Sequence, residues 1–257
     1  MPYFRRLDEH SFRATDEVSG AWNIDDQHIA PALGLLVHAI EQHRDRRRSD
    51  GLRVGRLSYD ILGTVPVDAV EVAVRVVRPG RTIELVEASL SHGGRVVVLL
   101  RAWLLQSRDN QRIVGTPLPR LKPPADVAPW DPTSVWPGGF IDSAEVRRDQ
   151  EAPGRASFWV RTSTALLDDE PVSDLARFAG LLDIANGMTV RAAPAEVAFP
   201  NVDLTAHFFA EPRGEWVGFD TSVSFGATGL GLTSSVIHDE HGPVGTLAQT
   251  LTVRPTG

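Results

Sequence analysis

The chain of 257 residues has no cysteine. This absence excludes disulfide bonds and thiol chemistry, and it leaves the redox compartment undetermined. Basic side chains are also in deficit, because 26 Lys and Arg residues stand against 33 Asp and Glu residues. The net charge of −7 argues against a broad nucleic-acid surface, which needs an excess of positive charge. A local basic cluster would still be enough to hold an anionic small molecule.

Long apolar runs and several well-known motifs are missing as well. No apolar run approaches the roughly 18 residues of a membrane span, and residues 1–20 lack the apolar core of a signal peptide. We therefore expect a soluble cytoplasmic protein with no membrane partner. The chain has no Gly-x-Ser-x-Gly motif, no glycine-rich phosphate loop and no dinucleotide fingerprint. Because His28 and His38 lack a matching third ligand, we also expect no metal site.

The sequence does contain one order of elements written twice. In each half a strand precedes a helix that is apolar on most of its circumference, and four strands follow. The halves run from about Ser11 to Leu105 and from about Ala156 to Pro255, with helices at His28–Ile40 and Ser173–Ile184 and closing strands at Gly93–Leu105 and Gly242–Val253. With so few helices, each apolar helix must be covered by a sheet that curls around it. The pattern predicts an α+β fold with two antiparallel sheets, each wrapped around a long central helix.

A proline-rich stretch separates the halves. Residues 116–139 hold seven prolines and little periodicity, as expected of a semi-rigid linker. We divide the chain into an N-terminal unit of residues 1–110, a linker of residues 111–152 and a C-terminal unit of residues 153–257. The basic run Arg44–Arg48 has two readings: it complements the negative end of the first helix, or it meets a phosphate of a nucleotide-bearing ligand.

Several segments resemble the acyl-CoA thioesterases of the type II, double-hotdog family. Trp22 followed by His28-Ile-Ala-Pro-Ala-Leu-Gly-Leu-Leu is similar to the entry to the first helix of that family. Arg78-Pro-Gly-Arg81 is similar to its strand turn, and Val202–Phe209 and Leu247–Arg254 are similar to motifs of its second half. The resemblance covers nearly the whole chain, and it rests on the order and spacing of these segments together.

The resemblance implies an activity and a site. The family hydrolyses acyl-CoA to free acid and CoA with a water held by an Asp, a Ser or Thr, and a Gln of the second hotdog, without cofactor or metal. The Asp and the Gln fall on Asp183 and Gln249. The hydroxyl position falls on Asn201, which departs from the family, and Thr205 is the nearest hydroxyl that could replace it. An exposed sheet edge in each half suggests that two chains associate, as in hotdog relatives, so we expect a homo-oligomer, a dimer of double hotdogs.

The residues themselves support part of this assignment. Asp183 lies in an apolar helix near its C-terminal end, where burial and the helix dipole would raise the pKa of the carboxyl toward that of a general base. The alternative is an Asp on a solvent-facing stripe or a partner for a loop amide. Strand alternation places Gln249 on the apolar face of its strand, where an amide needs hydrogen-bond partners. A structural Gln bonded to backbone is the alternative there.

Other interpretations of the polar residues and of the function stay open at this point. A row of polar residues on one strand face, which includes Asp203 and His207, either lines a site or is simply exposed. A hotdog protein that binds an acyl or other apolar ligand without catalysis is the alternative function, and a hydratase is less well supported because no Asp–His pair is evident. Aligned on the closing turn, Gln249 matches Arg101, so we expect a single site in the second copy.

Overall fold

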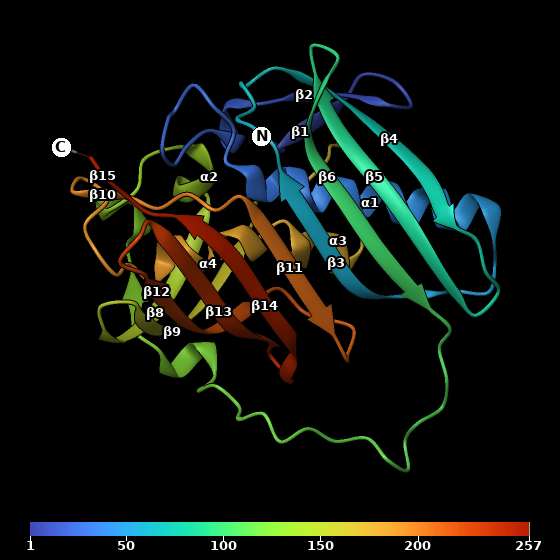
Figure 1. The fold of residues 1–257 in the computed structure, drawn as a ribbon. Helices are drawn as coiled ribbons and strands as arrows, with labels where there is room; N and C mark the ends of the chain where they lie inside the picture. The colour runs from blue at the N-terminus through green and yellow to red at the C-terminus, as the bar shows by residue number, and fades with distance from the viewer. Residues whose placement is uncertain (257) are drawn as a thin grey trace.

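The structure is a computed structural model that describes residues 1–256. The two copies follow one another along the chain, as the sequence predicts (Figure 1). The first copy comprises β1 (Phe4–Arg6), β2 (Ser11–Ala14), η1 (Asp16–Val18), α1 (Ile29–Arg47), β3 (Arg53–Ile61), β4 (Ala69–Arg78), β5 (Ile83–His92) and β6 (Arg95–Leu105). The connection to the second copy holds η2 (Pro124–Asp126), β7 (Pro129–Trp130), η3 (Pro132–Ser134) and α2 (Gly139–Asp142).

The second copy repeats this order. It comprises β8 (Ala144–Ala152), β9 (Arg155–Thr162), α3 (Asp174–Ala179), η4 (Leu182–Ile184), α4 (Ala185–Met188), β10 (Val197–Ala198), β11 (Asp203–Phe208), β12 (Val217–Phe225), β13 (Leu230–Asp239), β14 (Gly242–Thr252) and β15 (Arg254–Pro255). Residues 144–152, which we assigned to the linker from their sequence, form β8 and pair with β9. The pairing of β8 along its length makes this segment part of the second copy rather than a free connection.

The expected pair of separate sheets is wrong, because one sheet of 13 strands runs through both copies. Its order is β1-β2-β4-β5-β6-β3-β11-β14-β13-β12-β9-β8-β7, and β10 and β15 form a small ribbon apart from it. The two halves join where β3 pairs antiparallel with β11, with Leu57 opposite Ala206 and Tyr59 opposite Leu204. These four side chains are at most 1% exposed, so the junction is built on the core face of the sheet.

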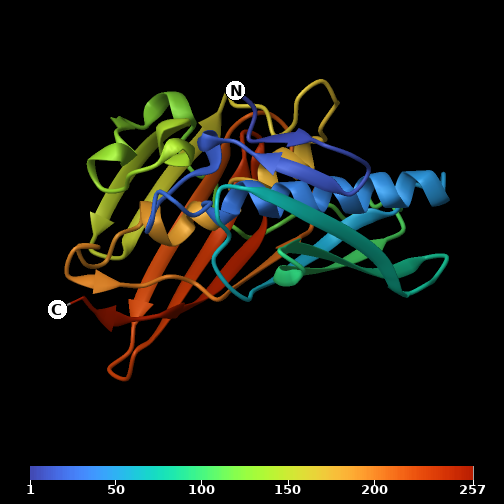
Figure 2. The same cartoon turned by 90° about the horizontal axis from the view of Figure 1, so that it is seen from above.

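The sheet curls around the helices of both copies (Figure 2). In the first copy α1 is a continuous helix of 19 residues, which runs past the predicted end at Ile40 to Arg47. In the second copy the expected long helix is broken: α3 ends at Ala179, and η4 and α4 carry the chain on in short turns. The break follows Gly180, where the chain meets α1. No helix in the described residues is both long enough and apolar enough to cross a membrane.

The helices of the two copies cross at a pair of glycines. A Cβ atom placed on Gly34 of α1 would lie 2.6 Å from the backbone oxygen of Ala176 and 3.0 Å from Cα of Gly180. Only the absence of a side chain allows this approach. The crossing therefore fixes where the second helix stops, one turn before Asp183.

The basic run at the end of α1 is neutralised by carboxylates. Arg47 and Arg48 donate to Glu84, at 2.6 and 3.0 Å, and the Glu84 side chain is only 2% exposed. Arg46 pairs with Glu9, and Arg44 with Asp45. These ion pairs hold the end of α1 against β5. They explain the cluster of arginines without a phosphate ligand.

Candidate active site

Three of the side chains predicted from the sequence meet in the second copy. Asp183 lies in η4, Gln249 on the inner face of β14, and Asn201 just before β11. Asn201 Nδ2 donates to Asp183 Oδ1 at 2.6 Å, and Gln249 Nε2 donates to the same oxygen at 3.1 Å. A second bond from Asn201 Nδ2 to the Asp203 backbone oxygen, at 3.2 Å, holds the Asn201 amide in place. The geometry thus joins residues that are far apart in the sequence.

The surroundings of Asp183 favour its protonated form. The residue is 6% exposed and forms no ion pair with any residue of the described chain. Burial raises the pKa of the Asp183 carboxyl from 3.8 to about 7, and the bonds from Asn201 and Gln249 only partly oppose this. Both amides use Oδ1, and no hydrogen bond within residues 1–256 reaches Oδ2. The carboxyl therefore has one oxygen held by the protein and one available to a ligand or a water, with a pKa near neutrality.

Thr205, the candidate replacement for the family hydroxyl, does not join this group. Its neighbours Leu204 and Ala206 are fully buried, so strand alternation places Thr205 on the opposite face of the sheet. There its Oγ1 shares a hydrogen bond of 3.0 Å with Ser58 Oγ of β3. His207 is exposed on the same face. Asp203 accepts from the Thr250 backbone nitrogen at 2.5 Å and is likewise directed away from Asp183.

The position that corresponds to Gln249 in the first copy follows from the pairing of the strands. Ala102 lies opposite Val86 in the β5–β6 hairpin, as Gln249 lies opposite Thr233 in the β13–β14 hairpin. Each hairpin also has a register shift at the same place, after Leu90 in one and after Ile237 in the other. The structural counterpart of Gln249 is therefore Ala102, and the expected match with Arg101 is wrong by one residue. A slip of one residue moves a side chain to the other face of a strand, which is why Arg101 points outward to Glu87.

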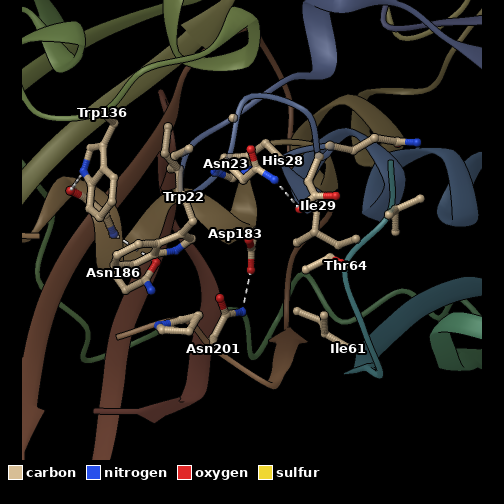
Figure 3. A pocket seen from close by; sticks show the side chains of 18 of the residues that line it. Trp22, Asn23, His28, Ile29, Ile61, Thr64, Trp136, Asp183, Asn186 and Asn201 are labelled. Carbon is tan, nitrogen blue, oxygen red and sulfur yellow. Dashed lines mark hydrogen bonds between the residues drawn. The ribbon is translucent and has the colours of Figure 1, made fainter. Parts of the chain in front are cut away.

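A cavity of about 460 Å³ lies beside Asp183, between the two copies. Figure 3 shows Asp183 directed into it, with Asn201 below and Trp22 and Trp136 along one side. Trp22 packs edge-on against Trp136 and Phe199, with ring centroids 4.7 and 5.2 Å apart. The cavity walls come from residues 20–29 and 61–65 of the first copy, 136 and 141 of the connection, and 183–188, 200–202, 252 and 254 of the second copy. The cavity is thus largely apolar, and the carboxyl side chains of Asp183 and Asp26 are among its lining residues.

His28 also lines this cavity, a placement that its sequence context did not predict. The residue precedes α1, and its Nδ1 accepts a hydrogen bond of 3.2 Å from the Ala30 backbone nitrogen. His38, the other candidate ligand, lies elsewhere and bonds Glu170 through Nε2 at 3.3 Å. No group of three potential metal ligands occurs among the described residues. The signal available in the sequence was the position of His28 six residues after Trp22, immediately before the first helix.

The sequence matches two family models, one in each copy. The model of the acyl-CoA thioesterase N-terminal domain matches residues 18–105. The model of the acyl-CoA thioesterase C-terminal domain matches residues 122–253, just over half of the chain. No curated protein sequence matches the chain.

Solved structures show the same fold at low sequence identity. A hot dog fold protein of unknown function from Alicyclobacillus acidocaldarius has a TM-score of 0.75 at 17% identity, over 97% of this chain and 95% of that one. The acyl-CoA thioesterase II TesB2 of Mycobacterium marinum has a TM-score of 0.70 at 17% identity, over 99% and 96%. The tesB protein of Mycobacterium avium subspecies paratuberculosis has a TM-score of 0.65 at 16% identity, over 98% and 96%. At these identities the likeness concerns the hotdog fold.

Proposed function

Because the chain belongs to the acyl-CoA thioesterase family, we propose that it hydrolyses the thioester of an acyl-CoA to a free acid and CoA. The observation that supports this most is the contact of Asn201 and Gln249 with one oxygen of a buried Asp183, beside a largely apolar cavity. A carboxyl held in this way, with a pKa of about 7, suits a general base at neutral pH. The reaction needs no cofactor and no metal.

The proposed step uses Asp183 Oδ2 and a water molecule. The carboxylate takes a proton from the water while the water oxygen forms a bond to the thioester carbon, and the carbonyl electron pair moves onto its oxygen. When this pair returns, the carbon–sulfur bond breaks and the CoA sulfur takes up the proton from Asp183. Asn201 and Gln249 keep Oδ1 occupied, so that Oδ2 is the oxygen that faces the water. An amide at position 201 thereby takes the place of the hydroxyl that the family has there.

The cavity gives room for the acyl chain. Its volume of about 460 Å³ lies within the range of ligand pockets, and the rings of Trp22 and Trp136 supply apolar surface at its side. Since residues of both copies form its walls, substrate binding depends on the whole chain and not on the second copy alone.

Asp183→Asn tests this function. The variant keeps the shape of the side chain and an oxygen that accepts from Asn201 and Gln249, but it cannot take a proton. We expect thiol release from a panel of acyl-CoAs to fall by about 10²–10⁴-fold, as the loss of a general base does. Asp203→Asn is the matched control, because Asp203 is a nearby carboxyl on the other face of β11, and it should retain the parent rate. Parent-like turnover by Asp183→Asn would exclude the proposed role.

The departure at Asn201 favours one alternative, a hotdog protein that binds an acyl or other apolar ligand without hydrolysing it. Calorimetry and thiol release on the same acyl-CoA separate the two functions. Binding with release of free CoA supports hydrolysis, whereas tight binding with no CoA released over hours identifies a binding protein. Replacing Asn201 by Thr is informative as well, since a large gain in turnover would show that the amide at this position limits catalysis.

A further inference from the structure

The two nitrogens of His28 have different surroundings. Nδ1 accepts a hydrogen bond from the Ala30 backbone nitrogen at 3.2 Å, and so it carries no proton, because a backbone N–H can only donate. Burial lowers the pKa of the His28 imidazole to about 3, and the ring is therefore neutral at pH 7. A neutral ring whose Nδ1 is an acceptor has its proton on Nε2. His28 is thus held as a hydrogen-bond donor of fixed tautomer.

The Nε2–H group belongs to a side chain that lines the same cavity as Asp183 (Figure 3). The ring packs on Phe140 with centroids 4.2 Å apart and planes inclined by 34°, which restricts its rotation. Nε2 donates no hydrogen bond to another described residue, so this donor is available to a molecule in the cavity. Asp183 and His28 come from different copies and line the same cavity.

The second copy shows that helix capping alone does not require a histidine. There Ser173 caps α3, with its Oγ accepting from the Ala176 backbone nitrogen at 3.0 Å. Serine is among the preferred residues for this task, and its side chain ends at the capping atom. His28 performs the same task with Nδ1 and has a second nitrogen beyond it. The feature that distinguishes the first copy is therefore a second ring nitrogen on a capping side chain that lines the cavity.

We propose that His28 Nε2–H donates a hydrogen bond to the carbonyl oxygen of the bound thioester, and so stabilises the oxyanion that forms when water attacks. This inference rests on the proposed function. It adds a hydrogen-bond donor for the carbonyl oxygen to the general base, Asp183, on the other side of the site. A neutral donor suits this place, because a cation facing Asp183 would lower the pKa of that carboxyl and weaken it as a base. The base of the second copy and the donor of the first copy together make one site.

His28→Ser tests the inference with the fold preserved, since serine can cap α1 as Ser173 caps α3. We expect kcat to fall about 100-fold, the usual effect of losing one oxyanion donor. Binding of two non-hydrolysable CoA analogues isolates the contact: a ketone, which keeps the carbonyl and replaces sulfur by CH₂, and a thioether, which has no carbonyl. The variant should bind the ketone about tenfold more weakly than the parent protein and the thioether equally well.

Loss of the ring from the cavity wall would weaken both analogues alike, and that result, or an unchanged kcat, overturns the inference. His28→Asn serves if His28→Ser unfolds, because asparagine also caps helices well and its short side chain cannot reach the position of Nε2. It should show the same selective loss of ketone binding. The proposed function fails separately, if the parent protein neither releases CoA nor binds either analogue.

Discussion

At the scale of single residues, Asp183 combines a stability cost with a chemical use. Its pKa is about 7 in the folded protein and 3.8 in an ordinary setting. Between these values the folded state keeps a proton that the unfolded state has lost, so the stability of the protein falls as pH rises from about 4 to about 7. A difference of about three pH units corresponds to about 4 kcal/mol, all of which is lost above pH 7.

The Asp183→Asn variant makes this cost measurable. Its side chain has no proton to lose, so its free energy of unfolding should exceed that of the parent protein by a margin that grows by about 4 kcal/mol between pH 4 and pH 8. Urea unfolding of both proteins at several pH values checks this. His28 titrates alike in the two proteins and cancels from the difference. If the difference in free energy of unfolding between the two proteins did not change with pH, burial would not raise the pKa of the Asp183 carboxyl.

Most of the candidate site could be predicted at this scale, and the failures have a physical reason. Asp183 and Gln249 are polar residues in apolar patterns, and such a pattern can be recognised in a single sequence. Thr205 was predicted by proximity along the strand, but alternation turns its side chain to the other face. His28 was overlooked because its two nitrogens serve different purposes, and only the fold shows which one is free.

At the scale of elements, the crossing of α1 and α3 sets the position of Asp183. The apolar pattern of residues 173–184 predicts a continuous helix, yet the chain leaves α-helical geometry after Gly180. The cause lies in α1, where Gly34 contacts the backbone of the second copy. A pattern within one segment cannot reveal a break that a distant segment imposes.

Gly34→Ala should loosen this crossing. Its Cβ would lie 2.6 Å from the Ala176 backbone oxygen, and backbone atoms cannot rotate away as a side chain does. We expect the free energy of unfolding to fall by about 2 kcal/mol, typical of overpacking, even though alanine favours a helix. Gly115→Ala, at a position with no atom within 4 Å, is the control and should change stability little. Equal stability of the two variants, measured by urea unfolding, would contradict the role given to the crossing.

At the scale of the whole molecule, the sequence predicted two units but not that they share one sheet. Each half has its own complete pattern of strands, and nothing within β3 or β11 identifies the partner on its open side. The structure pairs these two strands and ends the sheet instead in β1 and β7, of three and two residues. Short outer strands offer little for edge-to-edge association, so the exposed edges that suggested a homo-oligomer are brief.

A shared sheet should make the two copies unfold together. One cluster of buried side chains runs through both copies, and it includes Leu57 of β3 and Leu204 of β11 on either side of the junction. Opening one copy would expose this junction as well as the cavity wall, so neither copy is expected to persist alone. Calorimetry should give a single transition with equal van't Hoff and calorimetric enthalpies, and near-UV and far-UV circular dichroism should report the same midpoint. Two resolved transitions would mean that the copies are independent domains and that the pairing of β3 with β11 is weak. A site built from both copies would then open before either copy unfolds.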